Sequence, residues 1–163
     1  MTAEPAGSRP AVQPQAPPAA LLKVGNAMFR TLLRSPLHGV VSGSFVVLHV
    51  TGRKTGRRYD VGVGRHDVEG GLLVVTSVPW RKNFAGGAPL EVTVGGRRRP
   101  AHGDLLEDPD VVADLYLAQI ERLGWKRGNR LGIKINVGRT PTHEELADAV
   151  RRDNLSVVRI RYS

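Results

Sequence analysis

Residues 45–106 decide the fold, and they read FVVLHVTGRKTGRRYDVGVGRHDVEGGLLVVTSVPWRKNFAGGAPLEVTVGGRRRPAHGDLL. This stretch contains short runs rich in Val and Leu, mostly bounded by Gly or Asp: Phe45–Val50, Tyr59–Val63, Leu72–Ser77, Leu90–Val94 and Pro100–Leu106. Such residues favour strands, and the pairs Gly70-Gly71 and Gly95-Gly96 are typical of hairpin turns. Because no crossover helix separates the strands, the pattern predicts an antiparallel meander or barrel and not a doubly wound sheet.

Helices and a last strand flank this β region. The predicted elements are helices over about 20–34, 109–123 and 143–152, and a strand over Leu155–Tyr162. Ser35-Pro36 ends the first helix, because proline disfavours helical geometry in the residue before it. Asp108-Pro109 is typical of a helix start, and Thr142 with Glu145 forms a capping box. The expected fold class is therefore mainly β with flanking helices (α+β).

The first twenty residues differ in composition from the rest of the chain. Five of the eleven prolines lie there, among Ala, Gln, Gly and Ser, so we expect residues 1–20 to be a disordered tail. Residues 21–163 are expected to form one domain. No run of large apolar residues precedes Leu21, and later apolar runs are too short to span a membrane, so we expect a cytoplasmic protein.

The charge balance is strongly basic. The chain carries 24 Lys and Arg against 15 Asp and Glu, a formal charge of +9, and it has no Cys. The lack of cysteine excludes disulfides, thiolate metal sites, iron–sulfur clusters and a cysteine nucleophile. No two of the five histidines have the spacing of a helical metal site, and none has an obvious carboxylate partner nearby in the sequence. We therefore expect no metal and assign no catalytic residue.

The first candidate site is a glycine-bounded turn after the first strand. It holds Arg53, Lys54, Arg57 and Arg58, and its spacing suits an anion site, since glycine lets backbone N–H groups approach a ligand while arginine supplies forked donors. The alternative is a solvated hairpin tip. The P-loop pattern is absent from this stretch.

The second candidate site follows the strand that ends at Ser77. Its sequence, Ser77-Val78-Pro79-Trp80-Arg81-Lys82-Asn83, sets an aromatic residue beside two cations, which suits a planar ring with an anionic tail. The alternative is a loop with one core tryptophan. Two further basic stretches, Arg97–Arg99 and the region from Trp125 to Lys134, have no assigned role at this point.

Taken together, two stretches resemble the deazaflavin-dependent nitroreductase family, which belongs to the flavin/deazaflavin oxidoreductases with a split β-barrel fold. The first is Thr51-Gly52-Arg53-Lys54-Thr55-Gly56-Arg57 after an apolar strand, and the second is Trp80-Arg81-Lys82-Asn83-Phe84 leading into Gly86–Val92. The resemblance covers about residues 25–108. It implies a split β-barrel of the type that binds FMN or F420.

The resemblance also implies a site for coenzyme F420, with FMN as the alternative cofactor. In that case Arg53, Lys54, Thr55, Gly56 and Arg57 would hold the phosphodiester and glutamate tail. The residues implied to line the deazaflavin and the linker to its tail are Ser77, Val78, Trp80, Arg81, Lys82 and Asn83. The chain departs from the family pattern at Asp60, whose carboxylate would weaken the local positive field if it faced the anion site.

Three functions follow from these patterns. The first is an F420-dependent oxidoreductase that transfers a hydride between the cofactor and an unidentified small organic substrate. The second is a non-catalytic cofactor- or lipid-binding protein, or one that binds FMN, and the third is a nucleic-acid-binding barrel. Aromatic residues make up only 5% of the chain, which disfavours the third function. We expect no specific nucleic acid, peripheral contact with an anionic membrane, and a homodimer.

Overall fold

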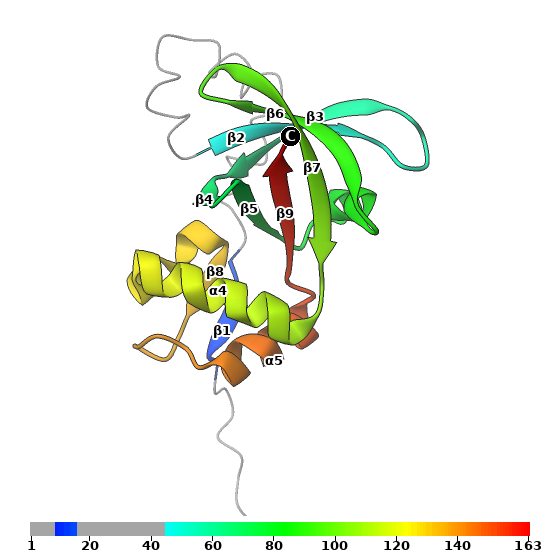
Figure 1. Ribbon diagram of the computed structural model, residues 1–163. Helices are drawn as coiled ribbons and strands as arrows, with labels where there is room; N and C mark the ends of the chain where they lie inside the picture. Colours follow the sequence, from blue (N-terminus) through cyan, green and yellow to red (C-terminus); the bar gives the residue numbers. More distant parts are fainter. Residues whose placement is uncertain (1–8, 16–44) are drawn as a thin grey trace, which may run out of the picture.

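The computed structural model describes residues 9–15 and 45–163, so the helix expected over 20–34 lies outside the described residues. Seven strands form one antiparallel sheet with the order β3-β2-β6-β7-β9-β5-β4 (Figure 1). Their bounds are β2 Phe45–Thr51, β3 Arg58–Gly64, β4 His66–Val68, β5 Gly71–Thr76, β6 Ala88–Val94, β7 Arg97–Leu106 and β9 Ser156–Tyr162. All five strands predicted within residues 45–106 and the last strand are present.

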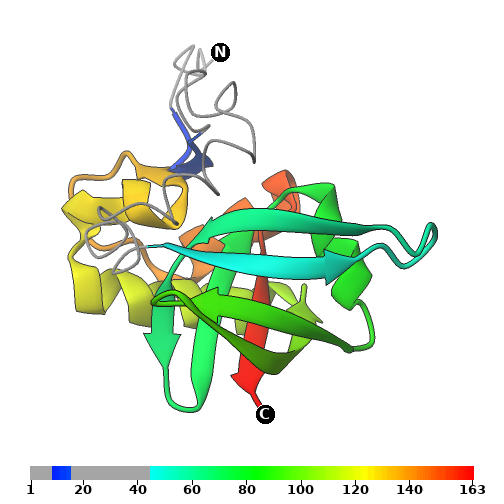
Figure 2. The ribbon, with the colours of Figure 1, turned by 90° about the horizontal axis from the view of Figure 1, so that it is seen from above.

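The sheet curls because its two edge strands are neighbours in the sequence. The edges are β3 and β4, and only Arg65 separates the end of β3 from the start of β4. A flat sheet would hold these edges far apart, so the sheet must bend until they meet at one corner. Figure 2 shows the resulting half-barrel from above. The predicted mainly β architecture, with a sheet like that of a split barrel, is confirmed.

Helices and a small second sheet cover one side of the half-barrel (Figure 1). They are α4 (Pro109–Leu123), the 3₁₀ helix η2 (Trp125–Leu131), β8 (Ile133–Ile135) and α5 (His143–Asp153). Asp108 caps α4, and Thr142 and Glu145 form the predicted capping box of α5. None of the helices in the described ranges is long and apolar enough to cross a membrane.

Two apolar cores share strands β5 and β9. Leu72, Val74, Val158 and Ile160 face the inside of the half-barrel, together with Val46, Leu48 and Val50 of β2 and Leu90 and Val92 of β6. Leu73 and Val157 face the other way and pack against α4 and α5. Both faces of β5 are therefore buried, which explains why its sequence is an unbroken apolar run.

The N-terminal segment contributes a strand that the sequence did not suggest. Val12–Pro14 forms β1, which pairs antiparallel with β8, and the Val12 side chain is fully buried in the core beneath α5. Asn136 donates from its backbone to Ala11 O over 2.8 Å, and Arg152 donates to Val12 O over 2.6 Å. The expected disorder is therefore wrong for residues 9–15. The composition suggested disorder because a single valine, Val12, provides the core packing of residues 9–15.

Candidate functional site

A tight turn joins β2 to β3, and we call Gly52–Arg57 the basic turn. The N–H of Gly52 donates to Arg57 O over 2.7 Å, and the N–H of Gly56 donates to Gly52 O over 2.9 Å. Gly56 has a φ of +66°, which glycine adopts without strain. Residues Arg53, Lys54, Thr55 and Arg57 of the turn are all exposed.

The second predicted stretch lies at the end of β5, and we call Ser77–Phe84 the tryptophan segment. Ser77 and Val78 are exposed, and residues Pro79–Phe84 form the 3₁₀ helix η1. Trp80 is half-buried and meets Phe84 edge to face, with ring centroids 6.1 Å apart. Phe84 is fully buried, and its ring packs against Gly103. A Cβ at position 103 would come within 2.6 Å of that ring. The segment is therefore anchored in the core by Phe84.

Asn83 joins the two predicted stretches. Its Oδ1 accepts a hydrogen bond from the backbone N–H of Arg53 over 2.8 Å. Its Nδ2 donates to Trp80 O over 2.9 Å and to the hydroxyl of Tyr59 over 2.5 Å. The Arg53 side chain reaches in the other direction and donates to Ala85 O over 3.3 Å. The basic turn and the tryptophan segment therefore lie side by side at one end of the sheet (Figures 1 and 2).

The surface at this end carries several exposed cations. Among the residues that the structure describes, no carboxylate forms an ion pair with Arg53, Lys54, Arg57, Arg58 or Lys82. Asp60 accepts a hydrogen bond from His49, with 2.7 Å between Oδ1 and Nδ1, instead of pairing with one of these cations. The surface can therefore attract an anionic ligand.

Arg81 differs from its cationic neighbours because it is buried, with only 7% of its surface exposed. Its Nη1 donates to Ser77 O, and its Nε has no hydrogen-bond partner. No carboxylate in the described ranges pairs with it. Buried polar groups are normally satisfied, and buried charges are normally paired. The structure thus holds a cation at this end whose charge the described chain does not neutralise.

A hydrogen-bonded chain that sequence reasoning missed lies on the opposite face of β2 from the barrel core. His49 contacts Asp60 through Nδ1 and Thr93 through Nε2, each over 2.7 Å. The order hydroxyl–imidazole–carboxylate matches that of a nucleophilic triad. However, Thr93 lies within β6 between β2 and β7, where ladder bonds occupy the backbone N–H groups that would have to stabilise an oxyanion. The chain is therefore suited to fixing β2, β3 and β6 together.

Two other histidines also have carboxylate partners. His102 lies 3.4 Å from Asp104 and His143 lies 3.1 Å from Asp114. No local carboxylate partner was expected for any histidine, and this is wrong for His102, because Asp104 lies two residues away on the same strand, β7. The partner of His143 is distant in sequence and is brought close by the packing of α5 against α4. Within the described ranges, no three His, Cys, Asp or Glu residues gather as a metal site would require.

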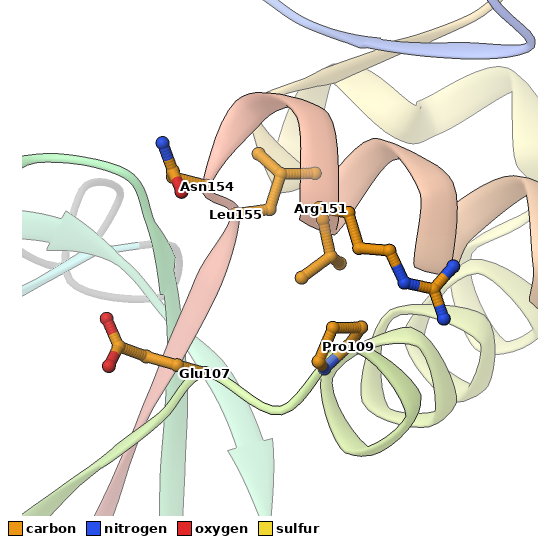
Figure 3. A pocket seen from close by; sticks show the side chains of 6 residues that line it. Glu107, Pro109, Arg151, Asn154 and Leu155 are labelled. Carbon is orange, nitrogen blue, oxygen red and sulfur yellow. The ribbon is translucent and has the colours of Figure 1, made fainter.

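Two cavities in the described part of the molecule lie away from the predicted site. The first, of about 180 Å³, lies between the start of α4 and the end of α5 (Figure 3). Arg151, on its wall, is paired with Asp148 over 3.1 Å and with Glu144 over 3.5 Å. The second, of about 130 Å³, lies beside η2 and β8 and is lined partly by Trp125 and Lys126. None of the predicted site residues lines either cavity.

Comparison with known proteins gives a structural likeness only. No protein-family model and no curated protein matches the sequence. A solved structure described as an F420 reductase is similar to this chain, with 15% sequence identity and a TM-score of 0.39. The match covers 82% of this chain and 92% of that one.

Proposed function

We propose that this protein is an oxidoreductase that uses coenzyme F420 and exchanges a hydride with a small organic substrate. The observation that carries the proposal is the position of Asn83, which bonds to Arg53 across thirty residues of sequence. The two stretches whose combination resembles the nitroreductase family are thereby held at one place. A role in one ligand site requires this proximity.

The residues at this end fit the chemical groups of the cofactor. Its tail is anionic, and Arg53, Lys54 and Arg57 are exposed cations without acidic partners in the described chain. Its ring is planar and aromatic. Beside the half-buried Trp80, Val78 is 53% exposed and provides apolar surface for such a ring.

The chain's own contribution to the reaction is binding and orientation. The bound deazaflavin would supply the hydride chemistry, so the protein needs no acid–base pair of its own for that transfer. Arg53, Lys54 and Arg57 would hold the tail by charge-assisted hydrogen bonds. Asn83 would fix the distance between the tail site and the ring site, and Trp80 would exclude water from one side of the ring.

The structure offers less support for a nucleic-acid-binding barrel. Two of the three arginines at the β6–β7 hairpin have partners within the protein. Arg98 pairs with Glu91 over 3.1 Å, and the guanidinium of Arg99 lies 4.0 Å from the ring centroid of Tyr162. These contacts leave fewer free cations on that hairpin than the sequence alone suggests.

Fluorescence titration of the protein with F420, FMN and an oligonucleotide tests the proposal. We expect F420 to quench tryptophan fluorescence with a dissociation constant of about micromolar order, weakening as salt rises. Quenching should persist in Trp125→Phe and be lost in Trp80→Phe. The reduced cofactor should then be oxidised when a suitable acceptor is added. Tighter binding of FMN would identify the other cofactor, and binding of the oligonucleotide alone would overturn the assignment to an enzyme.

A further inference from the structure

Arg81 stands apart among the buried polar residues. In the described part of the chain these are His66, Arg81, Gln119 and Ser156. Gln119 accepts hydrogen bonds from Arg122, and Ser156 donates to Thr76 O over 2.6 Å. Burial lowers the pKa of His66, which favours its neutral form. Arg81 alone carries a permanent charge, because a guanidinium does not lose its proton in proteins.

The hydrogen-bond inventory of Arg81 is incomplete. A guanidinium offers five N–H donors, and here one bond is made, from Nη1 to Ser77 O. The acceptor is a neutral carbonyl, so it leaves the positive charge uncompensated. Burying a charge is costly unless a counter-charge and further hydrogen bonds offset the loss of water. The described chain supplies neither to Arg81.

We propose that Arg81 anchors an oxyanion subsite that receives a phosphate or carboxylate group. The planar fork of a guanidinium suits the two oxygens of such a group. The subsite lies in the tryptophan segment, beside the exposed cation Lys82 and close to Arg53 through Asn83. This proposal extends the proposed function. It rests on that function only when we ask whether the oxyanion belongs to the cofactor or to the substrate.

Thermal unfolding of the ligand-free protein tests the subsite. Inorganic phosphate is compared with chloride at equal ionic strength, which separates specific binding from screening. We expect phosphate to raise the melting temperature of the wild-type protein and to have no such effect on Arg81→Met. In chloride, Arg81→Met should melt at or above the temperature of the wild-type protein, because a buried cation without a counter-charge in the described chain is replaced by an apolar side chain of similar length.

Matched variants make this experiment decisive. Arg97→Met makes the same substitution at an exposed position on the β6–β7 hairpin and should keep the full phosphate response. Arg81→Lys keeps the charge without the fork and should retain a reduced response, which covers the case in which Arg81→Met does not fold. A phosphate response that is absent in the wild-type protein, or unchanged in both Arg81 variants, would overturn the proposal.

A second arm identifies the source of the oxyanion. Binding of F420 is compared with binding of the same deazaflavin lacking the phosphodiester and glutamates. If Arg81→Met weakens F420 about tenfold or more while the tail-free form is unaffected, the oxyanion comes from the cofactor. If neither ligand is affected while the phosphate response is lost, it comes from the substrate. If F420 does not bind the wild-type protein and the Arg81-dependent phosphate response remains, the proposed function fails and the subsite stands.

Discussion

The backbone N–H of Arg53 donates to Asn83 Oδ1 over 2.8 Å. Sheet topology explains this contact. Strand β2 pairs antiparallel with β6 in a register that sets His49 opposite Glu91, so the end of β2 meets the start of β6. The basic turn follows β2 and η1 precedes β6, which brings Arg53 and Asn83 to the same end. The side-chain amide of Asn83 can then hold the basic turn against η1.

Replacing Asn83 by leucine should separate the two parts of the site. The substitution keeps the approximate size of the side chain and removes the acceptor for Arg53 and the donor to Tyr59 and Trp80 O. We expect the dissociation constant of F420 to rise at least about tenfold, since three hydrogen bonds, each worth about 1 kcal/mol, are lost. Hydrogen exchange at the Arg53 amide should also become faster.

Asn129→Leu provides a control, because Asn129 is an exposed residue of η2. It should leave both the affinity for F420 and exchange at Arg53 unchanged. If Asn83→Leu exchanges at the Arg53 amide as slowly as the wild-type protein, Asn83 does not hold the turn in solution.

The packing of β1 predicts a stability effect far from the barrel. Val12 is fully buried, so Val12→Ala should lower the free energy of unfolding by about 2 kcal/mol through lost burial and a residual cavity. Val68→Ala makes the same change at a strand position that is 36% exposed and should cost about 0.5 kcal/mol or less. Urea unfolding measures both. Equal effects of the two substitutions would mean that residues 9–15 are not docked.

The capping box of α5 predicts acid sensitivity. The Arg139 guanidinium and the N–H of Thr142 lower the pKa of Glu145 from 4.5 to about 2. Because the pKa is lower in the folded state than in the unfolded state, the stabilisation is fully present above pH 4.5 and is lost as pH falls from 4.5 toward 2. Glu145→Gln should reduce this loss in urea unfolding curves recorded across that range. A wild-type acid profile in the variant would contradict the assignment.

His66 predicts a second pH effect at milder acidity. Burial, and then the charge of Arg122, lower its pKa below 6.5 in the folded state. Between that lowered value and 6.5 the unfolded chain binds a proton that the folded chain does not, so stability is greatest above pH 6.5 and declines as pH falls through this window. His66→Leu should flatten the decline in melting temperature between pH 7.5 and 5.5. An unchanged slope would show that His66 is not the group responsible.

Local patterns predicted much of the fold. Helix α4 begins and ends where Asp108-Pro109 and Gly124 indicate, because caps act on neighbouring residues. The Gly95-Gly96 turn is present, with positive φ at both residues. The strand order was not predictable in this way. The C-terminal strand β9 enters the sheet between β7 and β5, and nothing in its sequence indicates those partners.

The site shows the same division between local and long-range information. The composition of the basic turn follows from the sequence, and so does the presence of Trp80 beside cations. The contact of Asn83 with Arg53 and the His49–Asp60–Thr93 chain depend on strand register, which a single sequence does not specify. The burial of Arg81 runs against the usual exposure of arginine, so its sequence context predicted only a basic side chain near a ligand.

The most direct test of the central claim is the dissociation constant of F420 measured by calorimetry for three proteins. These are the wild-type protein, Arg53→Ala/Lys54→Ala, and Lys126→Ala/Arg127→Ala. The last removes an equivalent adjacent pair of exposed cations from η2 and so controls for net charge. We predict that the pair in the basic turn weakens binding at least about tenfold and the control pair hardly at all. Equal weakening by both pairs, or no binding of F420 to the wild-type protein, would contradict the account.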